Sequence, residues 1–135
     1  MAERIRLEIT TPERLLVSTD VEEVQIPGQN GYLGILPQHA PLISALQPGE
    51  ISYRSDGHKE RLAVSWGYVE VLPQRVTVLA EAAEKADEID VPRAEAARKR
   101  AEDLIRKPNP DTDINRATVS LQRAIARLQV AGKKL

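Results

Sequence analysis

Apolar and polar residues alternate over much of the first 88 residues. The segment Ile5–Ile9 reads Ile-Arg-Leu-Glu-Ile, and a period of two recurs over residues 24–26, 51–54, 62–71 and 76–80. This period places successive side chains on opposite faces of a strand, so each segment predicts a strand with one buried face. About eight short strands at roughly ten-residue spacing favour a sandwich or barrel. We therefore expect an antiparallel β-sandwich domain over residues 1–88.

Turn residues separate these strands. Asp56-Gly57 stands between two alternating segments and predicts a hairpin, because this dipeptide favours the positive φ angles that match strand twist. Gly67 interrupts the long apolar segment 62–71, and we expect it to break or bulge that strand.

The pattern changes to an alanine-rich helical one after Glu81. Asp90 is a good N-cap residue, and Pro92 suits the first helical turn. The sequence Pro-Asn-Pro over residues 108–110 cannot continue a helix, so the first helix should end at Lys107.

A second helix follows after about five residues. Asp111 or Thr112 is the expected N-cap, Asp113 adds negative charge near the start of the helix, and Gly132 ends it. Two helices with so short a connection predict an antiparallel hairpin over residues 89–135.

The apolar stripes of this hairpin consist mostly of alanine, which buries little area. Only six large apolar residues are available as anchors: Leu104, Ile105, Ile114, Leu121, Ile125 and Leu128. Two short helices with so few anchors are marginally stable alone. We expect the hairpin to be weakly held and to exchange between arrangements.

Composition narrows the class of protein. The chain of 135 residues contains 41% apolar and 29% charged residues, as in a soluble globular protein. It has no apolar run of the roughly 20 residues that a membrane span needs, and no secretory leader at its start. Zero cysteines exclude disulfides and thiolate sites and fit a cytosolic location. The scarcity of aromatic residues argues against stacking platforms for single-stranded nucleic acid.

Charge is divided unevenly along the chain. Residues 1–89 carry a net charge of −6, with 8 Lys/Arg and 14 Asp/Glu, whereas residues 90–135 carry +5, with 11 and 6. This division indicates two modules with different partners. Nucleic acid or an acidic protein surface would suit the basic module.

The search for catalytic chemistry finds no constellation. His39 and His58 lack ligand-like spacing, and no serine lies in a nucleophile elbow. A Gly-x-x-Gly-x-x-Gly spacing over residues 28–34 resembles a dinucleotide fingerprint superficially, but the prolines that follow exclude the required helix. We interpret these glycines as bend formers, and we predict no catalytic or metal site.

Residues 27–42 combine three glycines and three prolines with six apolar side chains. Such a segment should make sharp, defined bends while its apolar side chains point inward. Gln29, Asn30 and Tyr32 would then be presented outward at the tip of the first bend, as a rigid contact surface.

The same segment carries a family resemblance. Residues 28–42 (Gly-x-x-Gly-x-Leu-Gly-Ile-Leu-Pro-x-His-Ala-Pro-Leu) resemble the signature of the epsilon subunit of F-type ATP synthases. Further matches occur in order over residues 7–12, 63–71, 76–80, 89–94 and 123–131. The chain departs from the family at Trp66, where a glycine is usual.

The resemblance implies a ten-stranded sandwich followed by a helical hairpin. It also implies a non-catalytic rotor subunit of the central stalk, bound to the gamma subunit and the c-subunit ring and coupling proton flow to ATP synthesis in the alpha/beta head. Such a subunit lies at the cytoplasmic face of a bacterial inner membrane, or less expectedly at a thylakoid membrane. It reaches the membrane only through the complex, and nucleic acid is not among its partners.

Three sets of contact residues follow from the resemblance. The c-ring contact would comprise Gln29, Asn30, Gly31 and Tyr32, with His39 nearby. The hairpin would inhibit ATP hydrolysis by extending toward an acidic segment of the beta subunit, through Arg116, Arg123 and Arg127, together with Lys133 and Lys134. No cofactor is required, but some relatives bind regulatory ATP, and the corresponding residues here are Ile89, Asp90, Arg93, Ala94, Arg123 and Arg127.

Two other functions remain open from the residues alone. The hairpin could serve a free-standing module that senses a nucleotide, or its basic face could bind nucleic acid. Co-purification with gamma and c subunits distinguishes the rotor subunit from both.

Overall fold

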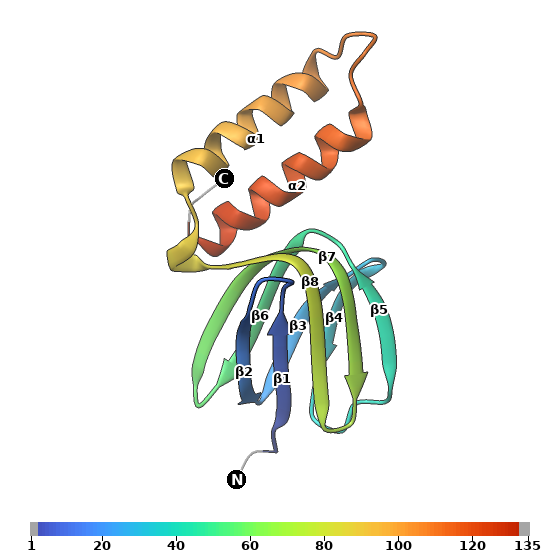
Figure 1. The fold of residues 1–135 in the computed structure, drawn as a ribbon, viewed down its shortest axis with the longest axis vertical. Coiled ribbons are helices and arrows are strands. Elements are labelled where there is room, and N and C mark those ends of the chain that lie inside the picture. The colour runs from blue at the N-terminus through green and yellow to red at the C-terminus, as the bar shows by residue number, and fades with distance from the viewer. Residues whose placement is uncertain (1–2, 133–135) are drawn as a thin grey trace.

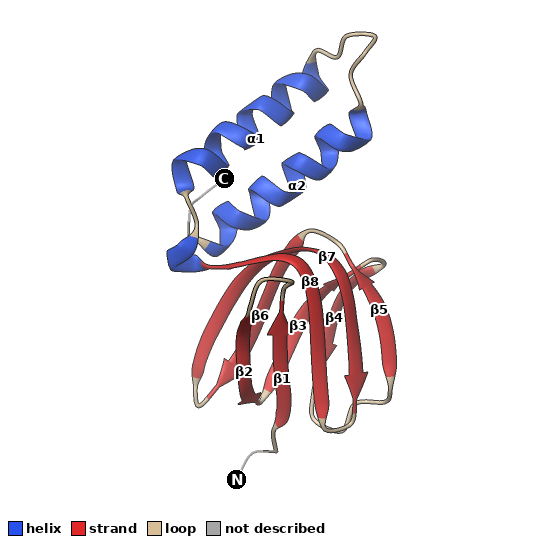
Figure 2. Ribbon diagram, in the orientation of Figure 1, coloured by secondary structure: helices blue, strands red, loops and turns tan. Residues whose placement is uncertain are grey.

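The computed structural model describes residues 3–132 and shows a β-sandwich with a helical hairpin docked on one end (Figures 1 and 2). The strands are β1 (Ile5–Thr10), β2 (Leu15–Val21), β3 (Glu23–Gly28), β4 (Gly31–Ile35), β5 (Leu42–Leu46), β6 (Gly49–Ser55), β7 (His58–Leu72) and β8 (Arg75–Lys85). A short 3-10 turn, η1 (Ala86–Glu88), connects the last strand to helices α1 (Val91–Arg106) and α2 (Ile114–Val130). The expected fold class is confirmed.

Strand β7 joins the two layers of the sandwich. Its first half pairs with β6 and its second half with β5, and β8 follows it antiparallel along most of its length. Trp66 and Gly67 bend the strand between these halves, with φ angles of +53° and +130°. Since β7 and β8 continue through the bend, the part of the chain that the structure describes has eight strands rather than the expected ten.

One pairing departs from the antiparallel expectation. Strand β1 pairs with β8 in parallel, with Leu7 opposite Val76 and Ile9 opposite Val78. A long stretch of chain separates the two strands, so no tight hairpin requires them to run in opposite directions. The sandwich is therefore mixed at this one position.

The core of the sandwich is aliphatic, as the absence of phenylalanine requires. Ile5, Leu7 and Ile9 are fully buried while the residues between them are partly exposed, which confirms the period-two interpretation of β1. The predicted hairpin is also present, because Ser55 pairs with His58 around Asp56-Gly57, and both turn residues have positive φ.

Capped termini define both helices. The side chain of Asp90 accepts a hydrogen bond from the backbone N–H of Arg93 (3.2 Å), as expected for the N-cap of α1. The N-cap of α2 is Asp113 rather than Asp111 or Thr112, which corrects the prediction. The hydroxyl of Thr112 instead accepts a hydrogen bond from the backbone N–H of Asn109 (3.0 Å) and closes the connecting loop.

The hairpin rests on the sandwich through α2, which packs against β6 and β7, while α1 packs along α2 (Figure 1). A small apolar cluster of Ile89, Ala63, Ala126 and Val130 forms the centre of this seam. Among the six expected anchors only Leu128 is fully buried, and Leu104 and Ile114 are more than 40% exposed. No helix within the described residues is long and apolar enough to cross a membrane.

Candidate functional site

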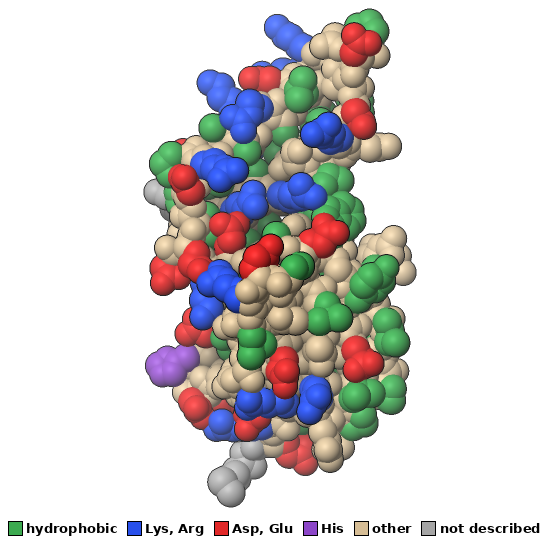
Figure 3. Space-filling view, viewed as in Figure 1, with side chains coloured by type: hydrophobic (Ala, Val, Ile, Leu, Met, Phe, Trp, Pro, Cys, Tyr) green, Lys and Arg blue, Asp and Glu red, His purple; other side chains and the backbone are tan. Residues whose placement is uncertain are grey.

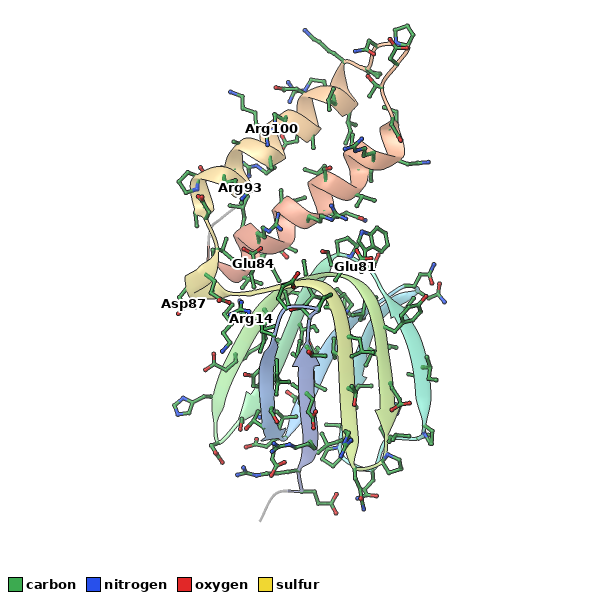
Figure 4. The ribbon with its side chains drawn as sticks, in the orientation of Figure 1. Arg14, Glu81, Glu84, Asp87, Arg93 and Arg100 are labelled. Carbon is green, nitrogen blue, oxygen red and sulfur yellow. The ribbon has the colours of Figure 1, made fainter. Side chains whose placement is uncertain are left out.

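A cleft of about 530 Å³ lies at the seam between the hairpin and the sandwich. The β1–β2 turn contributes Arg14, and β8 contributes Glu81 and Glu84; α1 contributes Arg93 and Arg100 (Figure 4). Arg127 of α2, Asp90 before α1 and Glu13 of the β1–β2 turn complete its charged lining, so four carboxylates share the cleft with four arginines. Four guanidinium groups from three separate elements therefore meet around one cavity.

An ion pair crosses the seam beside this cleft. Nε of Arg127 donates to Oε1 of Glu84 at 2.6 Å, and so connects α2 to β8. Arg123 lies one helical turn away, and its Nε is buried without a hydrogen-bond partner among the described residues. Arg123 and Arg127 line a second, small cavity in which Glu84 is the only carboxylate. Positive charge therefore exceeds negative charge at this part of the seam.

A second ion pair fixes the connection between the two domains. Nη2 of Arg14 lies 2.7 Å from Oε2 of Glu88, the last residue of η1. Oε1 of the same carboxylate accepts a hydrogen bond from the backbone N–H of Lys85 (3.0 Å). This backbone hydrogen bond and then the contact with Arg14 lower the pKa of Glu88, because both favour its charged form.

The residues predicted for ATP are only partly brought together. Asp90, Arg93, Ala94 and Arg127 line the seam cleft, and Arg123 lies in the adjoining small cavity. Ile89 does not reach either space, because it is buried in the apolar cluster beneath α2.

Sequence reasoning missed five charged residues of the cleft: Glu13, Arg14, Glu81, Glu84 and Arg100. A signal existed for Arg100, which follows Arg93 by seven residues and therefore shares its helical face. The other four lie in the β1–β2 turn or in β8, and no spacing connects them to the helical motif.

The residues predicted for the c ring fall at two ends of the sandwich. Gln29 and Asn30 form the β3–β4 turn, and Tyr32 follows in β4 with 59% of its surface exposed. The phenol oxygen of Tyr32 accepts a hydrogen bond from the backbone N–H of Glu50 (3.1 Å), which fixes the ring. Gly31 has a φ of +130°, as a bend former should, whereas Gly34 lies inside β4 and forms no bend.

His39 is not near this tip, which corrects the expected grouping. It follows the far end of β4, where the backbone N–H of the adjacent Gln38 donates to the carbonyl of Pro73 in the β7–β8 turn (2.8 Å). A strand rises about 3.3 Å per residue, so β4 separates His39 from the tip by the length of the sandwich layer. Nδ1 of His39 lies 2.7 Å from the carbonyl oxygen of Ala40, and this contact confirms its expected place in a turn.

The three arginines predicted to meet the beta subunit differ in accessibility. Arg116 is exposed in the first turn of α2, but Arg123 and Arg127 are turned into the seam. Lys133 and Lys134 lie outside the described residues. In this arrangement Arg127 is paired with Glu84, and the Nε of Arg123 is buried at the seam.

An apolar row crosses the outer face of the sandwich. We give this name to Leu15, Leu79, Tyr68 and Ile43, which are 58%, 54%, 63% and 71% exposed. Leu79 pairs with Tyr68, and the β5 partner of Tyr68 is Ala45, two residues from Ile43. Leu15 is separated from Leu79 by Thr10 of β1, which pairs with both. Figure 3 shows hydrophobic side chains gathered over the β5 side of the sandwich.

No group of three or more potential metal ligands occurs within residues 3–132. The seam cleft and the apolar row are features that suit ligand binding and protein binding.

Comparison with known proteins decides the family. The model of the ATP synthase delta/epsilon chain β-sandwich domain matches residues 4–86, and that of the delta/epsilon chain long α-helix domain matches residues 87–132. The chain belongs to the ATP synthase epsilon chain family. It is 50% identical over 133 residues to the ATP synthase epsilon chain of Syntrophobacter fumaroxidans, covering 98% of this chain and 99% of that relative. It is 48% identical over 128 residues to that of Bacillus velezensis, covering 95% and 97%.

Solved structures share the fold of the family at much lower sequence identity. A chain in the Euglena gracilis mitochondrial ATP synthase, a structure comprising OSCP, F1 and the c-ring, aligns with a TM-score of 0.80 at 22% identity over 95% of this chain and 81% of that one. A chain of the Tetrahymena thermophila mitochondrial ATP synthase central stalk and c-ring aligns with a TM-score of 0.58 at 12% identity, over 96% and 95%. The sandwich and the hairpin therefore occur together in known ATP synthase structures.

Proposed function

We propose that the protein is a non-catalytic central-stalk subunit of an F-type ATP synthase that joins the gamma subunit to the c ring. Its hairpin would restrain ATP hydrolysis by the alpha/beta head. The apolar row is the observation that carries this proposal, and the match of both family models across the chain supports it. The bacterial relatives fit a place at the cytoplasmic face of the inner membrane, reached only through the complex.

The apolar row is the proposed docking surface for gamma. Contiguous exposed apolar side chains on a small protein mark interaction sites, and aromatic residues dominate their energetics. Tyr68 lies between Leu79 and Ile43 on this face, so it is the expected centre of the contact.

Replacement of Tyr68 by aspartate tests this docking. Retention of gamma by the full chain should fall at least about tenfold, because a charge would have to be buried in an apolar contact. His58→Asp is the matched control, since His58 is exposed at the far tip of the β6–β7 hairpin. Undiminished gamma retention by the Tyr68 variant would exclude the row as the docking surface.

The proposed c-ring contact is the β3–β4 tip alone, formed by Gln29, Asn30, Gly31 and Tyr32. A rotor transmits torque through such a contact, so its parts must be stiff. The hydrogen bond from Glu50 to the Tyr32 phenol and the ladder between β3 and β4 supply that stiffness. His39 lies at the other end of β4 and is left out of this proposed contact.

The proposed inhibition of hydrolysis requires release of the hairpin. Arg123 and Arg127 face the seam in the docked arrangement, and only a detached hairpin could offer them to the beta subunit. The seam has few large apolar contacts to break, since its centre is a cluster of small and branched side chains. Docking and inhibition would therefore be mutually exclusive uses of the same two arginines.

Regulatory ATP binding is a second proposed activity, favoured by the seam cleft. Its volume lies within the usual range for small-molecule sites, and several guanidinium groups suit a polyphosphate. A nucleotide held there would contact both domains and keep the hairpin docked. Calorimetric titration of the full chain with ATP tests this activity, and the absence of heat at millimolar ATP would exclude the site.

A further inference from the structure

Arg14 stands apart from the other arginines of the seam cleft because it belongs to the sandwich. It ends the turn between β1 and β2, where its backbone is fixed by reciprocal hydrogen bonds with Thr11 (2.9 and 3.3 Å). The hydroxyl of Thr10 also donates to the carbonyl of Arg14 (3.1 Å). The base of this side chain is therefore held in one place.

The guanidinium of Arg14 is also held in place, but some of its N–H donors remain available. One of its nitrogens contacts Glu88 at 2.7 Å, and the backbone of Lys85 holds that carboxylate in turn. A guanidinium carries five N–H donors, so donors remain for another acceptor. The side chain is half exposed, at 50%, and it lines the cleft. An arginine held in this way loses little rotamer freedom when it binds a ligand.

Other cations line the same cleft from the helices. Arg93 and Arg100 are exposed on α1, and neither forms an ion pair within residues 3–132. Arg127 of α2 lines the cleft as well. Planar guanidinium groups from three elements match the separate oxygens of a polyphosphate better than those of a single carboxylate.

We propose that Arg14 contacts the phosphates of the bound nucleotide, so that the ligand joins the sandwich to both helices of the hairpin. Glu88 is a positioning residue that holds Arg14 toward the cleft. This inference rests on the proposed binding of ATP, and it adds a contact from outside the helical motif. Through this contact the nucleotide would bind the sandwich directly, next to the connection at η1.

Titration of the full chain with ATP, followed by calorimetry, tests the contact. Arg14→Ala should raise the dissociation constant about tenfold, since a charge-assisted hydrogen bond to phosphate is lost. Glu88→Gln should raise it only about twofold to threefold, because Arg14 remains but is held less firmly. Arg75→Ala is the matched control, as it removes the same charge at the far end of β8, and it should leave binding unchanged.

The outcomes separate the two proposals. Arg14→Ala binding with wild-type affinity would overturn the phosphate contact and leave the nucleotide site standing, whereas no binding by the wild-type chain would overturn both. Equal losses for Arg14→Ala and Glu88→Gln would show that the pair only clamps the connection at η1, which also overturns the contact. If Arg14→Ala fails to fold in a thermal melt, Arg14→Lys replaces it. Lysine keeps the charge but not the fork, so an intermediate loss is expected and wild-type affinity would contradict the contact.

Discussion

Backbone conformation at two adjacent residues determines how β7 serves both layers of the sandwich. Trp66 has a left-handed φ of +53°, which costs about 1 to 3 kcal/mol in a residue other than glycine. Position 67 is more strictly constrained, because its φ of +130° is accessible only to glycine.

The requirement for glycine at position 67 is directly testable. A Cβ on Gly67 would lie 1.9 Å from the carbonyl oxygen of Leu79, against backbone that cannot move without breaking the β7–β8 ladder. Gly67→Ala should therefore lower the free energy of unfolding in urea by about 3 kcal/mol. Gly34→Ala is the control, since no atom lies within 4 Å of its added Cβ, and it should change stability by less than about 1 kcal/mol. Equal effects at the two positions would contradict this account.

At the scale of elements, η1 is the connection between the sandwich and the hairpin. Its capping box and the ion pair between Arg14 and Glu88 attach it to the sandwich. The ion pair needs the carboxylate of Glu88 in its charged form, and the hydrogen bond from Lys85 is stronger to that form. The packing of the hairpin on the sandwich depends on α2, because α2 contacts β6 and β7 whereas α1 packs along α2.

Acid should loosen this connection. The pKa of Glu88 is lowered in the folded chain from its ordinary value of 4.5, so its contribution to stability is complete above that value. The contribution is lost as the pH falls through the folded pKa, because the carboxyl is then protonated in both states. Glu88→Gln should therefore destabilise the chain at pH 7, and its difference from wild type should shrink as the pH falls below 4.5.

Urea unfolding of both chains across this range is the appropriate measurement. Glu95→Gln on the exposed face of α1 serves as the control, since Glu95 forms no ion pair within residues 3–132. A difference between wild type and Glu88→Gln that stays constant with pH would exclude Glu88 as the titrating group.

At the scale of the whole molecule, an acidic sandwich and a basic hairpin meet across a small seam. The seam retains one cross-domain ion pair on α2, a small apolar cluster and an open cleft rich in arginine. Such a seam suits a domain that docks and releases, because few contacts must be broken and the same arginines can serve either state. A ligand that binds only the docked state would shift the population toward it.

Charge reversal on α2 tests the released state. Head complexes assembled with the Arg123→Glu, Arg127→Glu double variant should hydrolyse ATP faster than those with the wild-type chain. The reversed charges would be repelled by the acidic segment that the released hairpin is proposed to meet. Arg75→Glu should leave hydrolysis unchanged, and deletion of residues 90–135 gives the rate without any hairpin. Full inhibition by the double variant at low salt would exclude the electrostatic contact.

Local chemistry explains which features could be predicted. The alternation around Leu7, the Asp56-Gly57 turn and the Asp90 cap depend on neighbours in sequence, and all three occur as expected. The predicted N-cap of α2 was wrong because Thr112 and Asp113 are both suitable cap residues. In the structure the Thr112 hydroxyl accepts a hydrogen bond within the loop instead. Residue types alone cannot resolve such a competition.

By itself the sequence determined the two-part architecture, its family and the residues that start and end most elements, because hydrophobic period and turn chemistry act over a few residues. Only the tertiary structure decided that β1 pairs in parallel with β8, that His39 lies far from the β3–β4 tip, and that Arg14 and Glu84 share a cleft with the helical arginines. These relations join residues distant along the chain. They depend on how the sheet closes and where α2 packs, which no local pattern specifies.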